Sequence, residues 1–568
     1  MRLFTSTLIS KITTQKCNKM KTSNQLSFSK LENEFLEDAI KQLSQDYIII
    51  QIFYNKSVHS QDSHLIIHME NKNDIDKLKQ KHWIKKAHSE HKVHIHLFYN
   101  TQLHHKFDSG HPFVELYCKP SALIYQNEQC GNHLLIDRNW KKFNKKFKDY
   151  KERFYHDHNM LLSQTREFIK DESFVSVFLS YEKVIRYDLE YLENLYAGSS
   201  SDSKNLHERI YHLIPSAPEI QKYFIKQNGK EYYLISLFDK AKMSAREDEL
   251  MYDNEFFEAI SIAEESIFRM IEIRLDQLKK QIKKSPRDIE IPYEISNVLA
   301  DHNDKILDKA VQVIVKSENT EEIYLFHKST YGNSKIYYLL VIAHNVSNEK
   351  LKEIQYYLKN KAGKQYDFVL ISHDRYWIQQ HLYKYQNFFV NIMQGKNRIY
   401  ASNQYHPEPH WQFPYILEQD LDCYYKSAKG NCLQFLAIVG NESGNQQGIP
   451  FLFALFFLSF CRTYVFVKLC YMPNYLSFQS LWQLCLYANP DMIRYQYLFD
   501  GFLLKIIPTL EYHKILRHKF TCLDKEVVDQ MKTLVEKLMN ELDELVKKEG
   551  FIDKIKKDFE KFTSELHM

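Results

Sequence analysis

The feature that most constrains the fold is a long internal repeat, in which two stretches of the chain match about 275 residues apart. The first stretch, YIIIQIFYNKSVHSQDSHLIIHMENKNDIDKLKQ, begins at Tyr47, and the second, EEIYLFHKSTYGNSKIYYLLVIAHNVSNEKLKEIQ, begins at Glu321. We align three pairs at a separation of 275: Leu65 with Leu340, Phe113 with Phe388, and Tyr125 with Tyr400. A repeat of this length predicts that the chain forms the same folding unit twice.

Each copy predicts two strands, a helix and a third strand. β-Branched and aromatic runs mark the strands, and the charged segment between them has apolar residues at helical spacing. In the first copy the strands are Tyr47–Phe53, His64–Met69 and Val93–Tyr99, with a helix over Asn73–Lys86. In the second they are Ile323–Phe326, Tyr338–Ala343 and Tyr366–Ser372, with a helix over Asn348–Lys361. Strands that alternate with helices in this way predict a small mixed α/β sheet.

A helical stretch follows each predicted sheet. After the first we expect helices over Phe174–Leu195, Leu206–Leu213, Tyr232–Met243 and Asn254–Ile282. After the second we expect Ile449–Tyr471, Ser477–Ala488, Tyr495–Lys505 and Asp524–Lys548. Four antiparallel helices with an apolar stripe form a bundle. The predicted fold class is therefore α+β multidomain, with small mixed α/β sheets alternating with four-helix bundles in two copies.

The predicted domains follow from this order. We expect a disordered N-terminus over 1–30, α/β domains over 31–140 and 295–415, and helical bundles over 150–284 and 420–550. The segment Ser285–Pro292 is the expected linker at the midpoint.

One apolar run, 451–460, is only about 10 residues long, whereas a membrane-spanning helix needs about 20. We therefore predict a buried core helix, destabilised by Leu455→Asp, and no membrane partner.

The net charge and the cysteine content limit the classes of partner and the cellular location that we expect. The 568-residue chain carries a net charge of only +4, so it presents no strong field toward nucleic acid or a membrane surface. Its nine cysteines are scattered and form no C-x-x-C motif. In a chain long enough to fold without disulfides, this pattern is typical of reduced thiols, so we expect a cytoplasmic protein.

The order of a small α/β domain followed by a helical bundle resembles the nucleotidyltransferase–HEPN pairing of prokaryotic toxin–antitoxin and defence systems. In the second half the stretches YLFHKSTYGNSKIYYLLVIAH, FFVNIMQGKNRIYAS and FLSFCRTYVFVKLCYMPNYLSFQSLWQLC carry the resemblance. In the first half KAKMSAREDELMYDNEFFEAI is similar to a helix end of some HEPN domains. The resemblance implies a tandem duplicate of this pairing.

Nucleotidyl transfer of this type uses a Gly-Ser turn and three carboxylates that hold Mg²⁺ at the nucleotide phosphates. The first copy has Lys56-Ser57 at the turn, and Asp62 with His64 where two acids belong. The second has Lys328-Ser329 at the turn and Tyr337, Tyr338 and Leu339 on the strand. For the third acid the second copy offers Asp367 and Asp374. These departures predict a catalytically degenerate fold, in which Lys56, Ser57, Asp62, Lys328 and Ser329 are the candidate nucleotide-binding residues.

HEPN ribonucleases resemble one another in an arginine followed four to six residues later by a histidine. At the corresponding helix end Arg517 and His518 are adjacent, and they are our candidate catalytic pair for RNA cleavage. The spacing itself occurs at Arg153…His158, which we place in the linker before the first bundle, and at Arg375…His381, inside the second α/β unit. Neither lies where the motif belongs.

Histidines gather in the first copy. His64 and His68 share one face of their strand, and His94 and His96 share one face of the next. Four imidazoles on one sheet face can hold Zn²⁺ or Ni²⁺, but histidine also serves as an ordinary residue on the solvent face of a strand. We predict no metal site and no cofactor.

The function we predict is binding of a nucleotide, RNA or a protein partner in a defence or regulatory role. The apolar bundles also suit self-association, because HEPN bundles commonly pair. Two alternatives stay open: a metal-independent HEPN ribonuclease, and a structural or interaction scaffold.

Overall fold

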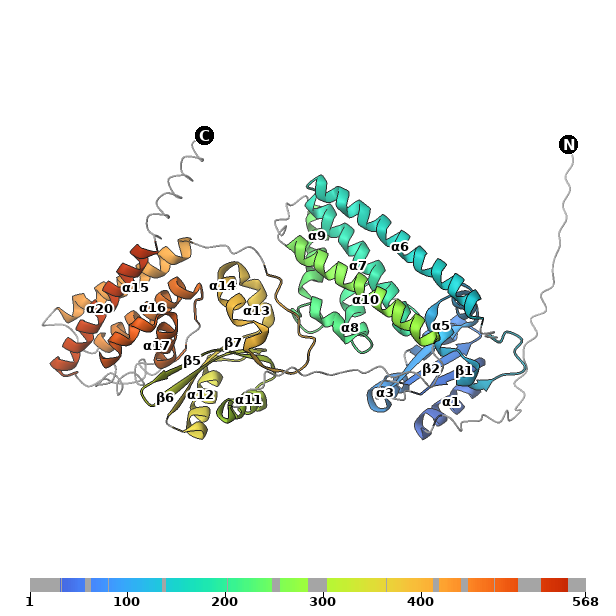
Figure 1. The fold of residues 1–568 in the computed structure, drawn as a ribbon, viewed down its shortest axis with the longest axis horizontal. Coiled ribbons are helices and arrows are strands. Elements are labelled where there is room, and N and C mark those ends of the chain that lie inside the picture. Colours follow the sequence, from blue (N-terminus) through green and yellow to red (C-terminus); the bar gives the residue numbers. More distant parts are fainter. Residues whose placement is uncertain are drawn as a thin grey trace. The chain divides into compact units, whose positions relative to one another are not determined.

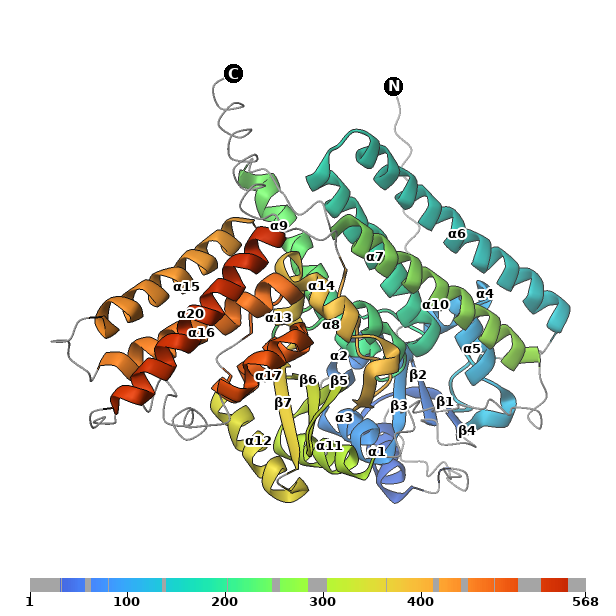
Figure 2. The same cartoon turned by 60° about the vertical axis from the view of Figure 1, so that its left-hand side comes forward.

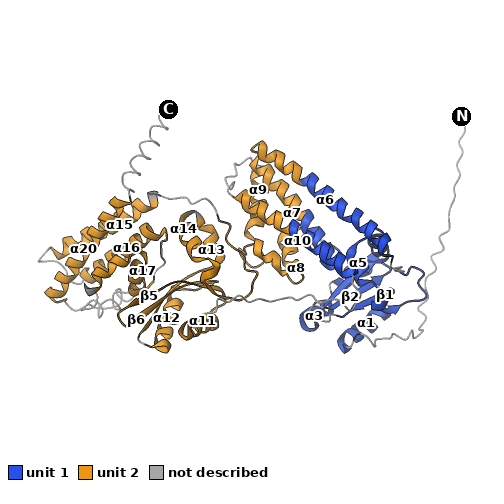
Figure 3. Cartoon of the chain, viewed as in Figure 1, with its two compact units in different colours: residues 1–161, 187–202, 268–290 blue, residues 162–186, 203–267, 291–568 orange. Residues whose placement is uncertain are grey.

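The computed structural model describes residues 31–549 except for positions 32, 57–62, 80, 135–138, 202, 248–255, 284–303, 364, 412–417, 441–447, 474–475 and 499–522. The fold is mixed α/β, with two small four-stranded sheets and many helices (Figure 1). Residues 1–161, 187–202 and 268–290 form one compact unit, and residues 162–186, 203–267 and 291–568 form the other (Figure 3). The expected disordered N-terminus and the expected midpoint linker lie outside the described residues.

The first sheet follows helix α1 (Glu34–Asp46), which Asn33 caps by accepting a hydrogen bond from the Leu36 amide. Its strands are β1 (Ile49–Asn55), β2 (Ser63–Met69), β3 (Val93–Tyr99) and β4 (Leu123–Gln126), in the order β3-β2-β1-β4. β1 is antiparallel to β2 and β4, and β2 is parallel to β3. The crossover between β2 and β3 is formed by α2 (Lys72–Lys79) and α3 (His82–His91). Helices α4 (Asn100–Asp108) and α5 (Pro112–Tyr117) lie between β3 and β4.

The second sheet repeats this plan. Helix α11 (Lys305–Ser317) precedes β5 (Thr320–Tyr331), β6 (Ser334–Ala343), β7 (Tyr366–His373) and β8 (Arg398–Ala401), in the order β7-β6-β5-β8. Helix α12 (Asn348–Ala362) crosses from β6 to parallel β7, and α13 (Arg375–Gln380) and α14 (Leu382–Ile392) follow. Both sheets have an irregularity at the same place, between Ile52 and Phe53 in β1 and between Ile323 and Tyr324 in β5. The shared strand order, strand directions and irregularity are those expected of a repeat.

These irregularities fix the true register between the copies. Tyr125 and Tyr400 occupy the same place, opposite Ile52 and Ile323, as aligned from the sequence. Phe53 faces Ile66, and Tyr324 faces Leu340, so the partner of Leu340 is Ile66 and not Leu65. The alignment of Leu65 with Leu340 was wrong by one residue. Since side chains alternate along a strand, that slip would have exchanged the two faces of the sheet.

The two faces of each sheet carry different cores. Leu65, Ile67 and Met69 pack with α1, α2 and α3, while Ile66 packs with residues of α4 and α5. In the second sheet the odd-numbered residues of β6 pack with α11 and α12, and the even-numbered ones pack with α13, α14 and the helices that follow. Figure 2 shows α11 and α12 on one face of this sheet and α13 and α14 on the other. Each sheet is therefore the middle layer of a three-layer unit.

The α-helices described after the first sheet are α6 (Trp140–Lys170), α7 (Phe174–Ala197), α8 (Leu206–Leu213), α9 (Tyr233–Glu247) and α10 (Phe257–Lys283). The sequence predicted the last four closely and missed α6, so the placement of Arg153…His158 in a linker was wrong. Within the first unit Phe154 of α6 stacks on Tyr191 of α7, with centroids 4.2 Å apart. Within the second unit Phe178 of α7 packs on Phe257 of α10, at 4.7 Å.

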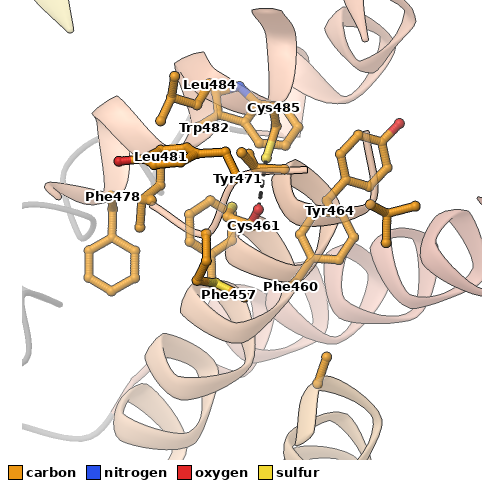
Figure 4. Packing of buried hydrophobic residues seen from close by; sticks show 14 of the residues in the cluster. Phe457, Phe460, Cys461, Tyr464, Tyr471, Phe478, Leu481, Trp482, Leu484 and Cys485 are labelled. Carbon is orange, nitrogen blue, oxygen red and sulfur yellow. Dashed lines mark hydrogen bonds between the residues drawn. The ribbon is translucent and has the colours of Figure 1, made fainter. Parts of the chain in front are cut away.

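The second helical region contains α15 (Glu418–Val439), α16 (Ile449–Leu469), α17 (Phe478–Ala488) and α20 (Lys525–Lys548). The sequence missed α15, and instead of the predicted helix from Tyr495 the described part holds a 3₁₀ segment over Pro490–Leu498. Helix α16 contacts α15, α17 and α20, which makes it the central helix of the group. Its Phe457, Phe460 and Tyr464 meet Leu481 and Cys485 of α17 in a continuous core (Figure 4).

Helix α16 is the one described helix that is long and apolar enough to cross a membrane, with 21 residues. Most of its apolar window, 61%, is buried inside the protein, as a core helix requires. Leu455 lies at the edge of this core and is only partly buried, so Leu455→Asp is a poor probe of it. Phe456 and Phe460 are fully buried and are better probes.

Candidate functional site

The structure describes three of the seven predicted site residues. Arg517 and His518 lie outside the described residues, and so do Ser57 and Asp62. Lys56 is exposed directly after β1, while Lys328 and Ser329 lie in the second sheet.

Lys328 and Ser329 are strand residues, and the prediction that they form the turn was wrong. They face Tyr337 and Ile336 across the β5–β6 hairpin, whose turn is Gly332-Asn333, with φ +58° at the glycine. Glycine adopts this conformation without strain. The Lys328 Nζ lies 3.0 Å from the Oδ2 of Asp304, whose Oδ1 caps α11. The charge of Lys328 is therefore already matched by a carboxylate.

The described residues of the two sheets do not gather the carboxylates that nucleotidyl transfer requires. Among the described residues of the two sheets, no three acids lie close enough together to share a metal ion. Asp367 accepts hydrogen bonds from Lys359 and from the amides of Gln479 and Gln483. Asp374 caps α13 by accepting from the amide of Trp377 at 2.6 Å. Both acids therefore have structural partners.

A buried ion network occupies the start of β5 and the end of β7. The Nη2 of Arg375 lies 2.7 Å from the Oε2 of Glu322, and its Nε lies 3.0 Å from the Oε2 of Glu321. Arg398 reaches the other Glu322 oxygen at 3.1 Å, and the Tyr324 hydroxyl donates to Glu322 at 2.9 Å. Burial by itself raises the pKa of Glu322, but Arg375 outweighs it and holds that pKa below its ordinary value. Arg375 is thus part of a structural ion network, and the spacing to His381 carries no ribonuclease motif.

The first sheet has a neutral network at the same place. The register aligns Gln51 with Glu322, because each precedes the paired isoleucine of its strand. Gln51 Oε1 accepts from the amide of Leu134 at 2.8 Å and lies 3.4 Å from a ring nitrogen of His68. The other ring nitrogen of His68 lies 3.3 Å from Asn100, which follows β3 as Arg375 follows β7. Burial lowers the pKa of His68 to about 4, so this network is uncharged at neutral pH.

The feature of the first sheet that its core does not explain is a histidine cluster, which we define as His64, His88, His94 and His96. The parallel register places His64 directly opposite His94, with ring centroids 5.4 Å apart. The ring centroid of His88, on α3, lies 4.4 Å from that of His94. A ring nitrogen of His64 lies 3.0 Å from one of His96, and the Tyr117 ring lies 4.4 Å from His64. His96 is nearly fully buried, and the other three are partly exposed.

The surroundings keep the inner imidazoles uncharged. Burial lowers the pKa of His96 to about 3, although the Ala197 carbonyl that its Nδ1 contacts at 2.9 Å opposes this shift. Burial and the neighbouring His96 and His94 hold the pKa of His64 well below its ordinary value. Neutral imidazoles have a nitrogen lone pair, so this cluster can accept hydrogen bonds.

The second sheet shows what the fold itself requires at these positions. The register aligns His64 with Tyr338, His94 with Val369 and His96 with Ile371. All three residues of the second sheet are buried in its apolar core. The same backbone is therefore stable without histidine there, and the histidine cluster is a property of the first copy alone.

The other motif of the first half is not a site. Arg153 and His158 are five residues apart on α6, so their side chains point about 140° apart around the helix. Arg153 is exposed and donates to its own helix at the Asp149 carbonyl, whereas His158 is buried with its Nε2 3.4 Å from Asp188. The two side chains do not converge.

Sequence reasoning named the members of the histidine cluster on the strands, but it missed His88 and the whole Arg375 network. A signal for this network was present in Glu322, a charged residue directly before the apolar run Ile323–Phe326 of β5. Comparison with family models, with curated proteins and with solved structures found no match for this chain.

Proposed function

We propose that this chain is a non-catalytic binding protein of the nucleotidyltransferase–HEPN type, in which the first sheet takes the ligand and the second half is a scaffold. The observation on which the proposal rests is that the two sheets have different residues at structurally equivalent positions. His64, His94 and His96 stand where the second sheet has a closed apolar core. The element order, with a sheet and then helices twice over, supports the family assignment within this proposal.

The ligand class we propose is a nucleotide or RNA. Asn55, the last residue of β1, pairs with His64, and exposed Lys56 comes directly after that strand. A lysine ammonium suits a phosphate as a point charge, and the rings of His64 and Tyr117 offer flat faces for a base. The absence of gathered carboxylates on the described parts of the two sheets favours binding over nucleotidyl transfer. None of the seven cysteines that the structure describes forms a disulfide, which supports a reducing, cytoplasmic location.

The test is a binding titration of the full chain with a fluorescently labelled RNA oligomer, and separately with ATP. We expect Lys56→Ala combined with His64→Tyr to weaken binding at least tenfold, because the phosphate contact and the ring site are both changed. Lys328→Ala is the matched control in the second sheet and should bind like the wild type. Equal affinity in all three proteins, or no binding of either probe, would refute the proposal.

A further inference from the structure

We propose that the groove between α11 and α12 is a docking surface for an acidic amphipathic segment of a partner protein. The groove belongs to the second sheet, so it goes beyond the proposed binding of a nucleotide or RNA and does not depend on it. The two helices cover the same face of this sheet (Figure 2), and a cavity of about 760 Å³ lies between them. Phe368 of β7 also lines this cavity, which lies within one compact unit.

The shape of the groove fits a chain segment. Its lining on α11 runs from Ile306 to Ser317, which corresponds to about 17 Å along a helix. Its lining on α12 runs from Lys350 to Ala362. A groove that follows two helices over about three turns suits a helical or extended segment better than a compact small molecule.

The groove combines an apolar lining with lysines. Apolar side chains from both helices and from β7 line it, among them Val313, Leu358 and Phe368. The residues that line the cavity also include four lysines and one acid, namely Lys309, Lys316, Lys350, Lys361 and Glu353. The acid already has a partner, because Glu353 lies 3.7 Å from the Nζ of Lys350. This surface is complementary to a segment with apolar residues on one face and carboxylates beside them.

The first copy shows that the fold does not require this surface. Helix α1 matches α11, since each has 13 residues and a side chain that caps its N-terminus. However, α1 contains four acids and one lysine, whereas α11 contains one acid and three lysines. Aligned from the caps, Asp38 stands where α11 has Lys309, and Gln42 stands where it has Val313. The basic charge and the apolar valine are therefore properties of the second copy.

The aromatic side chains at the groove favour a protein partner over RNA. Tyr356 is 72% exposed and extends the apolar surface at the edge of the cavity. Tyrosine is enriched in protein interfaces, because it combines an apolar ring with a polar hydroxyl. RNA sites stack bases on free aromatic faces, but the Lys361 Nζ lies over the Tyr357 ring, 4.5 Å from its centroid.

The experiment measures the fluorescence anisotropy of a labelled peptide, Leu-Glu-Glu-Leu repeated four times, on titration with the full chain. This peptide forms an acidic amphipathic helix, and the same peptide with lysine in place of glutamate is the charge control. We expect Lys309→Glu/Lys361→Glu to weaken binding of the acidic peptide about tenfold, because two attractions become repulsions. Val313→Gln introduces the residue of the first copy and should weaken binding roughly threefold, through lost apolar contact. Lys335→Glu/Lys396→Glu makes the same change of charge at exposed lysines outside the groove and should bind like the wild type.

Three results would overturn the proposal: no binding of the acidic peptide, equal binding of the lysine peptide, or equal affinity in Lys309→Glu/Lys361→Glu. Circular dichroism shows whether this double variant is folded, and Lys309→Ala/Lys361→Ala replaces it if it is not. An RNA oligomer that displaces the peptide, and that binds the same variant more weakly, would assign the groove to nucleic acid instead. Failure of peptide binding with intact RNA or ATP binding would remove only this inference and leave the proposed function standing.

Discussion

Replacing Glu322 by alanine should strongly destabilise the second sheet. The Glu322 side chain is 3% exposed and accepts from Arg375, Arg398 and Tyr324. In its absence Arg375, itself 5% exposed, keeps the Pro407 carbonyl as a neutral acceptor and Glu321, whose side chain is 41% exposed, as its carboxylate partner. Removing one partner of a buried ion pair costs about 3–5 kcal/mol, because the other charge stays buried without compensation. Glu321→Ala, the matched control on the neighbouring residue, should cost about 1 kcal/mol or less, as exposed pairs do.

The assay is native-state hydrogen exchange of the full chain, read on peptides from β5 and β7. A chain with two compact units need not unfold in one step, so the local free energy of opening is the proper quantity. The network also determines the direction in which the stability of the second sheet changes with pH. The folded pKa of Glu322 lies below its ordinary value, so its contribution is complete above about pH 4.3 and is lost as the pH falls through the folded pKa. Equal losses for Glu322→Ala and Glu321→Ala would refute the reasoning.

Three further predictions concern the cores. Phe460→Ala removes a fully buried ring from α16 and should cost about 3–5 kcal/mol in chemical denaturation, more than Leu455→Ala at the partly buried edge; equal losses would contradict the central position of α16. Gly198→Ala should lower the melting temperature well beyond Gly229→Ala: both glycines have positive φ, but a Cβ at Gly198 would lie 2.5 Å from Phe113 and one at Gly229 meets nothing within 4 Å. Burial holds the pKa of His373 at about 3, so the wild type loses stability as the pH falls below about 6.5, where the unfolded chain takes up the proton. The variant His373→Phe carries the residue that the first sheet has at that position. It should be less stable than the wild type at pH 7, because the Tyr471 hydroxyl, 2.7 Å from His373, loses its partner. Its melting temperature should nevertheless fall less steeply with decreasing pH, and an unchanged pH dependence would mean that His373 is protonated in the folded protein.

Much of the fold could be predicted because the spacing of apolar residues along the chain indicates where the helices and strands lie. Helix α8 was predicted with its exact bounds, and the strands β2 and β3 were predicted within one residue. Helices α6 and α15 were missed because their apolar residues are spread among many polar ones, so that a long half-exposed helix resembles a linker. The one-residue slip at Leu65 arose because the connection from β6 to β7 is one residue longer than that from β2 to β3, which only the pairing of the strands reveals.

The candidate site was less predictable. The strand histidines could be placed on one face from their spacing, but His88 reaches them from a helix whose position only the tertiary fold determines. The alignment of His96 with Ile371 depends on the sheet register. The conclusion that the fold does not require histidine at these positions therefore depends on the register as well. The Lys328 turn was misplaced because β5 continues to Tyr331, which moves the turn to Gly332-Asn333.

The most direct test of the central claim, that the chain binds and does not cleave, is incubation of the purified full chain with total RNA. Arg517→Ala/His518→Ala is the matched variant, and the readout is an RNA gel together with culture growth on expression. We predict intact RNA and normal growth for both proteins. RNA fragments or growth arrest with the wild type, both lost in the variant, would contradict the account and make the chain a HEPN-type ribonuclease.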